Sequence, residues 1–254
     1  MFSTIEILIG IAVLSVLAEC IYSLYKKDGV YSVRGTVGNM LHGVFLNIIS
    51  TKTSVAYFGF FFVLYSFLGY SHRGFDLFSF FTCLFFVDFF YYVFHRLHHS
   101  LSLLWVLHSV HHSDNKFNMS TYSRASLVQH IYMNVPMIPA VLVGFNPIII
   151  LYVSYVLFLY QLYCHSQYVR LPNILEKVLI TPHTHSIHHD QEMLHQNSNF
   201  GAMFSIWDRF LGTYTPEIDT FKPGIKGYHQ DNFIKMETDP IAQHIQHFFS
   251  PPRF

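Results

Sequence analysis

Charged residues are scarce in this chain of 254 residues: 12% are Asp, Glu, Lys or Arg, whereas a soluble domain carries about 25%. Acidic and basic residues balance at 15 each, which argues against nucleic acid as a partner. Cysteine is also rare, since Cys20, Cys83 and Cys164 are the only three and all lie in apolar stretches. We therefore expect buried thiols and no disulfide framework.

Apolar residues take the place of charge. They make up 52% of the chain, and the mean hydropathy of +0.32 favours a lipid bilayer as the principal solvent. A helix needs about 20 apolar residues to cross ~30 Å of hydrocarbon. Runs that meet or approach this length are Ile5–Tyr25, which contains Glu19, Ser54–Tyr70, Leu77–Phe94, and the stretch from His130 to His165.

The residues that flank or interrupt these apolar runs predict where the helices end. Lys26 and Lys27 follow the first run, which lacks a basic start and a small-residue cleavage site, so we expect a retained membrane helix. Lys52 and its Ser and Thr neighbours predict a break before the second span. The sequence Gly144-Phe-Asn-Pro147 predicts the turn of a helical hairpin in the last run.

These runs predict an all-α fold, a multi-pass membrane helical bundle followed by a polar helical cap from Pro172 onward. Counting the crossings places every dense histidine cluster on one face of the membrane. The Lys26, Lys27 and Arg34 loop would make that face cytoplasmic, since cytoplasmic loops carry an excess of Lys and Arg.

Histidine is abundant, with 18 residues, and three pieces share the spacing H-x-x-H-H: His95-Arg-Leu-His98-His99, His108-Ser-Val-His111-His112 and His185-Ser-Ile-His188-His189. At this histidine frequency the spacing would arise about 0.1 times by chance. Side chains at i, i+3 and i+4 share one face of a helix, so each piece presents two or three imidazoles together. Metal ligation suits this arrangement better than a histidine-rich surface patch or a proton path.

The residue types alone leave the metal open. The chain contains no H-E-x-x-H motif of zinc proteases, and Glu192-Met-Leu-His195 is its single Glu-x-x-His match. Eight or more imidazoles with almost no carboxylates suffice for two metal ions, and imidazole binds iron, copper, nickel and zinc alike.

At these residues the chain resembles the fatty acid hydroxylase / sterol desaturase superfamily of membrane di-iron enzymes. The resemblance covers Asp88-x-x-Tyr91-Tyr92-x-x-His95-Arg96-x-x-His99, Leu104-Trp105-x-x-His108-x-x-His111-His112-Ser113, Thr181-Pro182 with His185-x-x-His188-His189, and Asn199-Phe200-Gly201 followed by Ile206–Thr213. It implies two iron ions whose ligands are His95, His99, His108, His111, His112, His165, His185, His188 and His189.

Other residues near these motifs are not expected to bind the metal ions directly. Gln161 stands where some members carry a histidine, and His98 and His183 do not match ligand positions, so none of the three is included. Asp88, Tyr92 and Arg96 are candidates for residues that support the ligands, with Asp88 orienting an imidazole or bonding Tyr92 or a neighbouring helix. We expect Asp208 and Arg209 to pair locally. The remaining histidines are expected to be surface or interfacial residues and not ligands: His42, His72, His130, His195, His229, His244 and His247.

The resemblance divides the chain into N-terminal membrane helices (1–74), a fatty acid hydroxylase-like di-iron domain integral with them (75–215) and a C-terminal polar tail (216–254). It implies O₂-dependent hydroxylation or desaturation of a fatty acyl, sterol or isoprenoid C–H bond, in a channel lined by Leu77–Phe94 and Val141–Tyr163. No haem, flavin or ferredoxin motif is present, so electrons would come from a separate protein.

The cellular location and a second possible function can also be considered from the sequence. Short loops favour a bacterial inner membrane over the endoplasmic reticulum. The alternative to an enzyme is a histidine-rich metal-binding transporter or sensor without redox turnover. A transporter would need ionisable groups through the midplane, where these spans offer chiefly Glu19 and Asp88.

Overall fold

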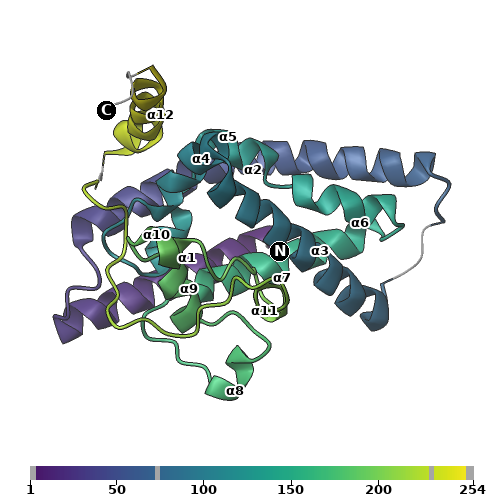
Figure 1. Ribbon diagram of the computed structural model, residues 1–254. Helices are drawn as coiled ribbons and strands as arrows, with labels where there is room; N and C mark the ends of the chain where they lie inside the picture. The colour runs from purple at the N-terminus through teal and green to yellow at the C-terminus, as the bar shows by residue number, and fades with distance from the viewer. Residues whose placement is uncertain (1–3, 72–74, 229–231, 250–254) are drawn as a thin grey trace.

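The computed structural model describes residues 4–71, 75–228 and 232–249 (Figure 1). Within these ranges the chain is helical, and β-bridges occur only as isolated pairs. The helices are α1 (Thr4–Lys26), α2 (Val33–Phe67), α3 (Leu77–Ser100), α4 (Ser102–His112), α5 (Leu127–Tyr132), α6 (Ile138–Leu142), α7 (Pro147–Cys164), α8 (Asn173–Glu176), α9 (Pro182–His188), α10 (Met193–Gln196), α11 (Ile206–Phe210) and α12 (Phe233–Phe249), with 3₁₀ turns η1 (Met119–Ser123) and η2 (Val135–Met137). The all-α prediction is confirmed.

Four helices are long and apolar enough to cross a membrane: α1 from Glu6, α2, α3 and α7. Their outward faces carry exposed apolar side chains such as Leu14, Val63 and Phe78, which hydrocarbon solvates better than water does. The chain is therefore an integral membrane protein.

The starts of these helices follow from local sequence. The side chains of Ser32, Asp76 and Asn146 accept hydrogen bonds from the first-turn amides of α2, α3 and α7, which satisfies amides that lack a partner inside the helix. Gly144, at φ 95°, and Pro147, at the first position of α7, form the predicted hairpin turn.

The break predicted near Lys52 is wrong. Helix α2 runs without interruption over 35 residues, about 52 Å at 1.5 Å per residue, and is therefore longer than ~30 Å of hydrocarbon. The hydroxyls of Thr51 and Thr53 bond carbonyls of the preceding turn, at Asn47 and Ser50, so the polar run stays helical.

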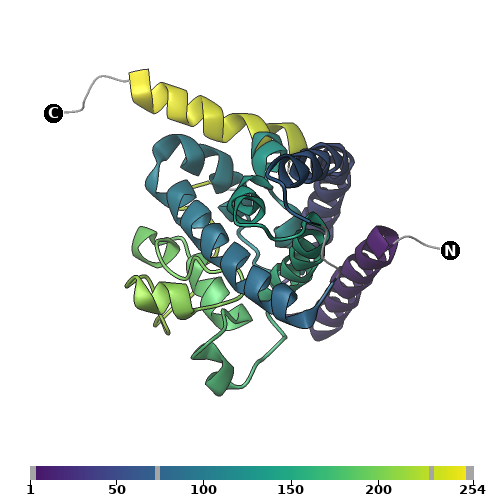
Figure 2. The same cartoon turned by 90° about the vertical axis from the view of Figure 1, so that its right-hand side faces the viewer.

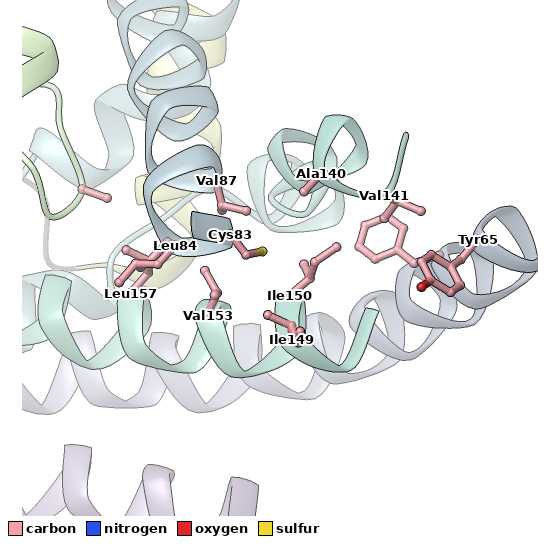
Figure 3. Packing of buried hydrophobic residues seen from close by; sticks show 12 residues of the cluster. Tyr65, Cys83, Leu84, Val87, Ala140, Val141, Ile149, Ile150, Val153 and Leu157 are labelled. Atoms are coloured by element: carbon pink, nitrogen blue, oxygen red, sulfur yellow. The ribbon is translucent and has the colours of Figure 1, made fainter. Parts of the chain in front are cut away.

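The apolar core lies where α2, α3, α6 and α7 meet (Figure 3). Cys83, Leu84 and Val87 of α3 face Ile150 and Val153 of α7, and all are buried. Because α3 packs against both α4 and α7, this core fixes the two helices that carry the first histidines relative to the end of α7.

The remaining segments form the cap. Figure 2 shows the segment after α7, with α8 to α11, on one side of the bundle, and α12 lying across another. The segment predicted as a polar tail thus contains a helix, and α12 packs against α4.

The prediction that His42 is a surface or interfacial residue is wrong. It is fully buried, with its Nε2 3.1 Å from a carboxylate oxygen of Glu237 on α12. The same carboxylate accepts from the Leu127 amide at the start of α5, so α12 is tied to α2 and α5. His130 is partly buried. His72, His229 and the side chains of His244 and His247 lie outside the described residues.

Candidate metal centre

Nine histidines from four segments converge at one end of the bundle. They form two groups, and within each group one nitrogen from every member lies within 4.8 Å of those of the others. The five-histidine group is His95, His99, His108, His112 and His188, and the four-histidine group is His111, His165, His185 and His189. These are the nine residues that the resemblance implied as ligands, and the structure brings all of them together.

The helical spacing explains how the groups form. On α3, His95 and His99 are four residues apart and share one face. On α4, His108 and His112 share a face toward the five-histidine group, whereas His111 points into the other group. The α9 motif divides in the opposite sense, because His188 joins the five-histidine group and its two companions the four-histidine group. Each of these two motifs therefore bridges the groups.

Backbone carbonyls orient several of the rings. Nδ1 of His95, His111, His165 and His188 lies 2.7–2.9 Å from the carbonyl oxygens of Phe200, Arg124, Gln161 and Ser198, respectively. An Nδ1–H that donates to a carbonyl leaves Nε2 unprotonated with its lone pair available, which is the usual arrangement of a metal-binding histidine.

The inward nitrogens fit cations better than they fit one another. Nε2 of His95 lies 3.0 Å from Nε2 of His108, and Nε2 of His165 lies 3.2 Å from that of His111 and 3.3 Å from that of His185. Buried nitrogens without a partner among the described residues belong to His99, His112, His185, His188 and His189. Each such atom costs about 1–3 kcal/mol when it stays unsatisfied. Two metal ions would accept these lone pairs, so the donor set fits the predicted metals.

Burial sets the protonation state of the imidazoles outside the spans. It lowers the pKa of His111 to about 4 and that of His188 to about 3, and it holds the pKa of His108, His112, His165, His185 and His189 well below the usual value. These rings are therefore neutral near pH 7, which is the form that binds a metal ion.

Asp88 does not contact an imidazole among the described residues, so it does not orient one directly. The predicted alternative, a bond to a neighbouring helix, is the one seen, because Asp88 bonds Trp207 of α11. The fully buried carboxylate accepts from the amides of Met203 (2.7 Å) and Phe204 (3.2 Å) and from the indole N–H of Trp207 (2.9 Å). It thus fixes the loop after Phe200, whose carbonyl meets His95.

Asp208 holds the other end of this loop. Its carboxylate accepts from the amides of Phe200 (2.8 Å) and Gly201 (2.9 Å) and from the hydroxyl of Thr213 (2.8 Å). A Cβ on Gly201 would lie 2.3 Å from the Phe204 carbonyl oxygen, so only glycine fits there. The predicted pairing of Asp208 with Arg209 is wrong, because Arg209 donates to the Glu176 carbonyl.

Tyr92 and Arg96 support the same loop from α3. The Tyr92 hydroxyl lies 2.9 Å from the hydroxyl of Thr213 and accepts from the Arg96 guanidinium at 3.1 Å. Since Thr213 also donates to Asp208, these side chains form one connected set next to the five-histidine group.

The residues left out of the predicted ligand set belong to neither group. His98 uses Nδ1 on the Phe94 carbonyl (2.7 Å) and Nε2 on the Tyr132 hydroxyl (3.0 Å). Gln161 donates to the Ala202 carbonyl, and His183 lies near the Pro216 carbonyl. The single Glu-x-x-His match ends at His195, whose Nδ1 is 3.0 Å from Asp190.

Two residues that contact the histidine groups were not predicted from the sequence. The Gln129 amide lies within 3.4 Å of Nδ1 of His108. The Phe117 ring stacks on His165 with centroids 5.4 Å apart. Phe117 lies in the loop after α4 and Gln129 in α5, a helix of six residues, and both are too short for a periodic pattern that shows which side chains face the site.

An open apolar groove of 720 Å³ runs along α3. It is lined by Leu77, Phe78, Phe81, Thr82, Phe85, Phe86, Phe89, Phe145 and Trp207. From the second stretch predicted to line a channel, Val141–Tyr163, only Phe145 contributes to this groove. Phe89, at one end of the lining, precedes His95 by six residues, about 9 Å along the helix.

Several known proteins match more than half of this chain. An alkylglycerol monooxygenase from Danio rerio is 36% identical over 133 residues, which are 52% of this chain and 30% of that protein. The Homo sapiens alkylglycerol monooxygenase is 31% identical over 175 residues, 65% of this chain and 35% of that protein. An ornithine lipid hydroxylase from Rhizobium tropici is 26% identical over 155 residues, 60% of this chain and 47% of that protein.

The chain thus spans less than half the length of each of these relatives. No solved structure matches it. The sequence profile named fatty acid hydroxylase matches residues 80–213, which is more than half of the chain and includes all nine histidines of the two groups. The chain therefore belongs to the fatty acid hydroxylase family.

Proposed function

We propose that this chain hydroxylates a lipid with O₂ at a di-iron centre held by the nine histidines. One observation supports it above all: two adjoining groups of imidazoles, seven of the nine buried, with unpartnered nitrogens inside the protein. Iron ions bound there would supply the reduction of O₂ and the oxidation of a C–H bond. The relatives' names, monooxygenase and hydroxylase, favour hydroxylation over desaturation.

The chain's own residues hold and shield such a centre. The carbonyls of Phe200, Arg124, Gln161 and Ser198 fix the ring orientations, and the loop tied to Asp88 and Asp208 covers the five-histidine group. Of the nine rings, His112, His165 and His188 have no exposed surface, so bulk water is kept from them.

The groove on α3 offers a place for the apolar part of a substrate. Phe81, Phe85 and Phe89 line it on a helix that crosses the membrane, so an acyl or alkyl chain can enter from the bilayer without passing through water. It runs toward the histidine end of α3. We propose that it guides a lipid chain to the site.

The electron donor and the orientation in the membrane are also proposals. We propose that a separate electron-transfer protein reduces the centre, because the sequence has no haem, flavin or ferredoxin motif. The loop between α1 and α2, which begins after Lys26, contacts the histidine-bearing end, since Lys116 donates to Gly29 and Tyr168 to Asp28. With the Lys and Arg bias of this region, the contact favours a cytoplasmic site. The short loops favour a bacterial inner membrane.

Purified protein tests the proposal. We expect two irons per chain after iron loading under anaerobic conditions, and an O₂-dependent hydroxylated product when reductant is added to protein in vesicles containing an alkylglycerol. Two zinc ions per chain and no product from an iron-loaded preparation would favour a metal transporter or sensor instead.

A further inference from the structure

Glu19 is a carboxylate inside the first membrane-spanning helix, and 8% of it is exposed. A buried charge in such a helix is costly unless polar groups satisfy it. Three donors from other parts of the chain do so: the Tyr31 hydroxyl, the Ser166 hydroxyl and the Met119 amide, the last at 3.1 Å. Glu19 therefore joins α1 to two segments that are far away in the sequence.

The first of these segments begins with a histidine of the four-histidine group. Ser166 directly follows His165, and its hydroxyl also accepts from the amides of Tyr168 (3.1 Å) and Val169 (3.0 Å). The Ser166 side chain thus closes the turn at the end of α7. Glu19, as acceptor of the Ser166 hydroxyl proton, fixes the position of that turn, and with it the ring of His165.

The second segment packs against the same ring. Glu19 holds the Met119 amide, and the aromatic rings on either side of Met119, those of Phe117 and Tyr122, lie 5.4 Å and 5.3 Å from the His165 ring centroid. Phe117 also lies 5.0 Å from the ring of His189. One carboxylate therefore anchors both the turn that carries His165 and the segment that packs against it.

We infer that Glu19 is a positioning residue for the metal ion of the four-histidine group. The inference rests on the proposed metal centre but goes beyond it, because Glu19 lies outside residues 80–213, the part that matches the family. It assigns α1 a role at the site in addition to spanning the membrane.

The inference is selective, and this makes it testable. The five-histidine group is supported by other contacts, chiefly Phe200, Gln129 and the loop held by Asp88 and Asp208. Loss of Glu19 should therefore weaken the binding of the metal ion in the four-histidine group and leave the binding of the other ion unchanged. If Glu19 served only to stabilise the fold, its loss would weaken the binding of both ions.

The experiment measures iron retained by the full chain in detergent during dialysis against increasing concentrations of a chelator. We expect Glu19→Ala to lose one of two irons at a chelator concentration about 10–100-fold lower than wild type, the usual effect of removing a residue that supports a metal ligand. Glu19→Gln should lose this iron at a concentration between those of wild type and Glu19→Ala. Its amide oxygen can still accept from Tyr31 and Met119, but its N–H₂ would face the Ser166 hydroxyl, whose two lone pairs already accept from the Tyr168 and Val169 amides.

Two double variants show which histidine group loses its iron when Glu19 is replaced. With His185→Ala, which removes a ligand of the four-histidine group, Glu19→Ala should change the remaining iron little. With His188→Ala, which removes a ligand of the five-histidine group, it should release most of the iron that remains.

Val16→Ala is the matched control. Val16 lies one turn away on α1, is buried and packs in the same cluster as Tyr31, Met119 and Leu162. Its truncation loosens this packing but leaves the hydrogen bonds of Glu19 in place. Equal iron loss in Val16→Ala and Glu19→Ala, loss from both groups, or full retention in Glu19→Ala would overturn the inference. Wild-type protein that binds no metal would instead overturn the metal centre itself.

Discussion

The two histidine groups differ in what holds them. The five-histidine group is supported by the loop between α10 and α11, with Asp88 and Asp208 bonding its backbone. The four-histidine group is supported by the end of α7 and the segment after α4, and both are tied to Glu19 on α1. Donor sets of similar chemistry thus depend on different parts of the chain, and only one of them on the N-terminal helix.

The largest expected effect comes from removing one ligand of each group. We expect His188→Ala and His185→Ala each to lower bound iron from two to about one per chain. Each should lower the oxidation rate by more than about 100-fold, because loss of a supporting residue alone costs 10–100-fold. Metal analysis and product formation measure both effects.

His98→Gln is the control for this pair, since His98 lies beside His99 but uses both nitrogens elsewhere. It should keep two irons. If His98→Gln loses as much iron as His188→Ala, the division into these two groups is wrong.

A smaller effect is expected from Asp208→Asn. An amide keeps one acceptor but presents an N–H₂ to the amide N–H of either Phe200 or Gly201, so the loop behind His95 is held less well. We expect the iron of the five-histidine group to be released at about 10-fold lower chelator concentration. The other iron should stay.

Arg209→Ala, a change at the next residue that removes a bond to the Glu176 carbonyl, should leave both irons in place. Release of the four-histidine iron by Asp208→Asn would show that the two supports are not separate.

The smallest expected effect is the response of metal-free protein to acid, which both groups share. The folded pKa of His111 is lowered to about 4 and that of His188 to about 3, from 6.5. Below pH 6.5 these imidazoles bind protons in the unfolded chain but stay neutral in the folded chain. The free energy of unfolding therefore falls as the pH decreases from 6.5 toward these values.

Asp208 opposes this trend, because burial raises its pKa to about 6, but it is one carboxyl against several histidines. We expect a lower Tm at pH 5.0 than at pH 7.5, measured in the same detergent. A Tm that stays constant or rises on acidification would mean that the buried imidazoles are not neutral.

Much of the fold and of the site follows from the sequence, for identifiable reasons. Long apolar runs and the Gly144–Pro147 turn predict the spans and the hairpin, because hydrocarbon tolerates only helices with few charges. Repeated spacing identifies the histidines on α3, α4 and α9, since i, i+3 and i+4 share a helical face. The polar run at Lys52 was misleading, because its threonines bond the helix backbone and do not interrupt it.

The supporting residues could not be predicted in the same way. Asp88 lies seven residues before His95 on the same helix, which suggested a direct contact, yet its carboxylate bonds amides 115 and 116 residues further along the chain. Phe117 lies in a loop and Gln129 in the six-residue helix α5, and neither segment is long enough to show a periodic pattern. Such contacts depend on where distant loops cross the site, and local spacing carries no information about that.

By itself, the sequence determined that this is a helical membrane protein with clustered imidazoles, because apolar length and helical spacing are local properties of the chain. Only the tertiary structure decided how nine histidines divide into two groups and that Glu19 supports one of them. The physical reason is that buried hydrogen bonds are made between whichever segments the packed helices bring together.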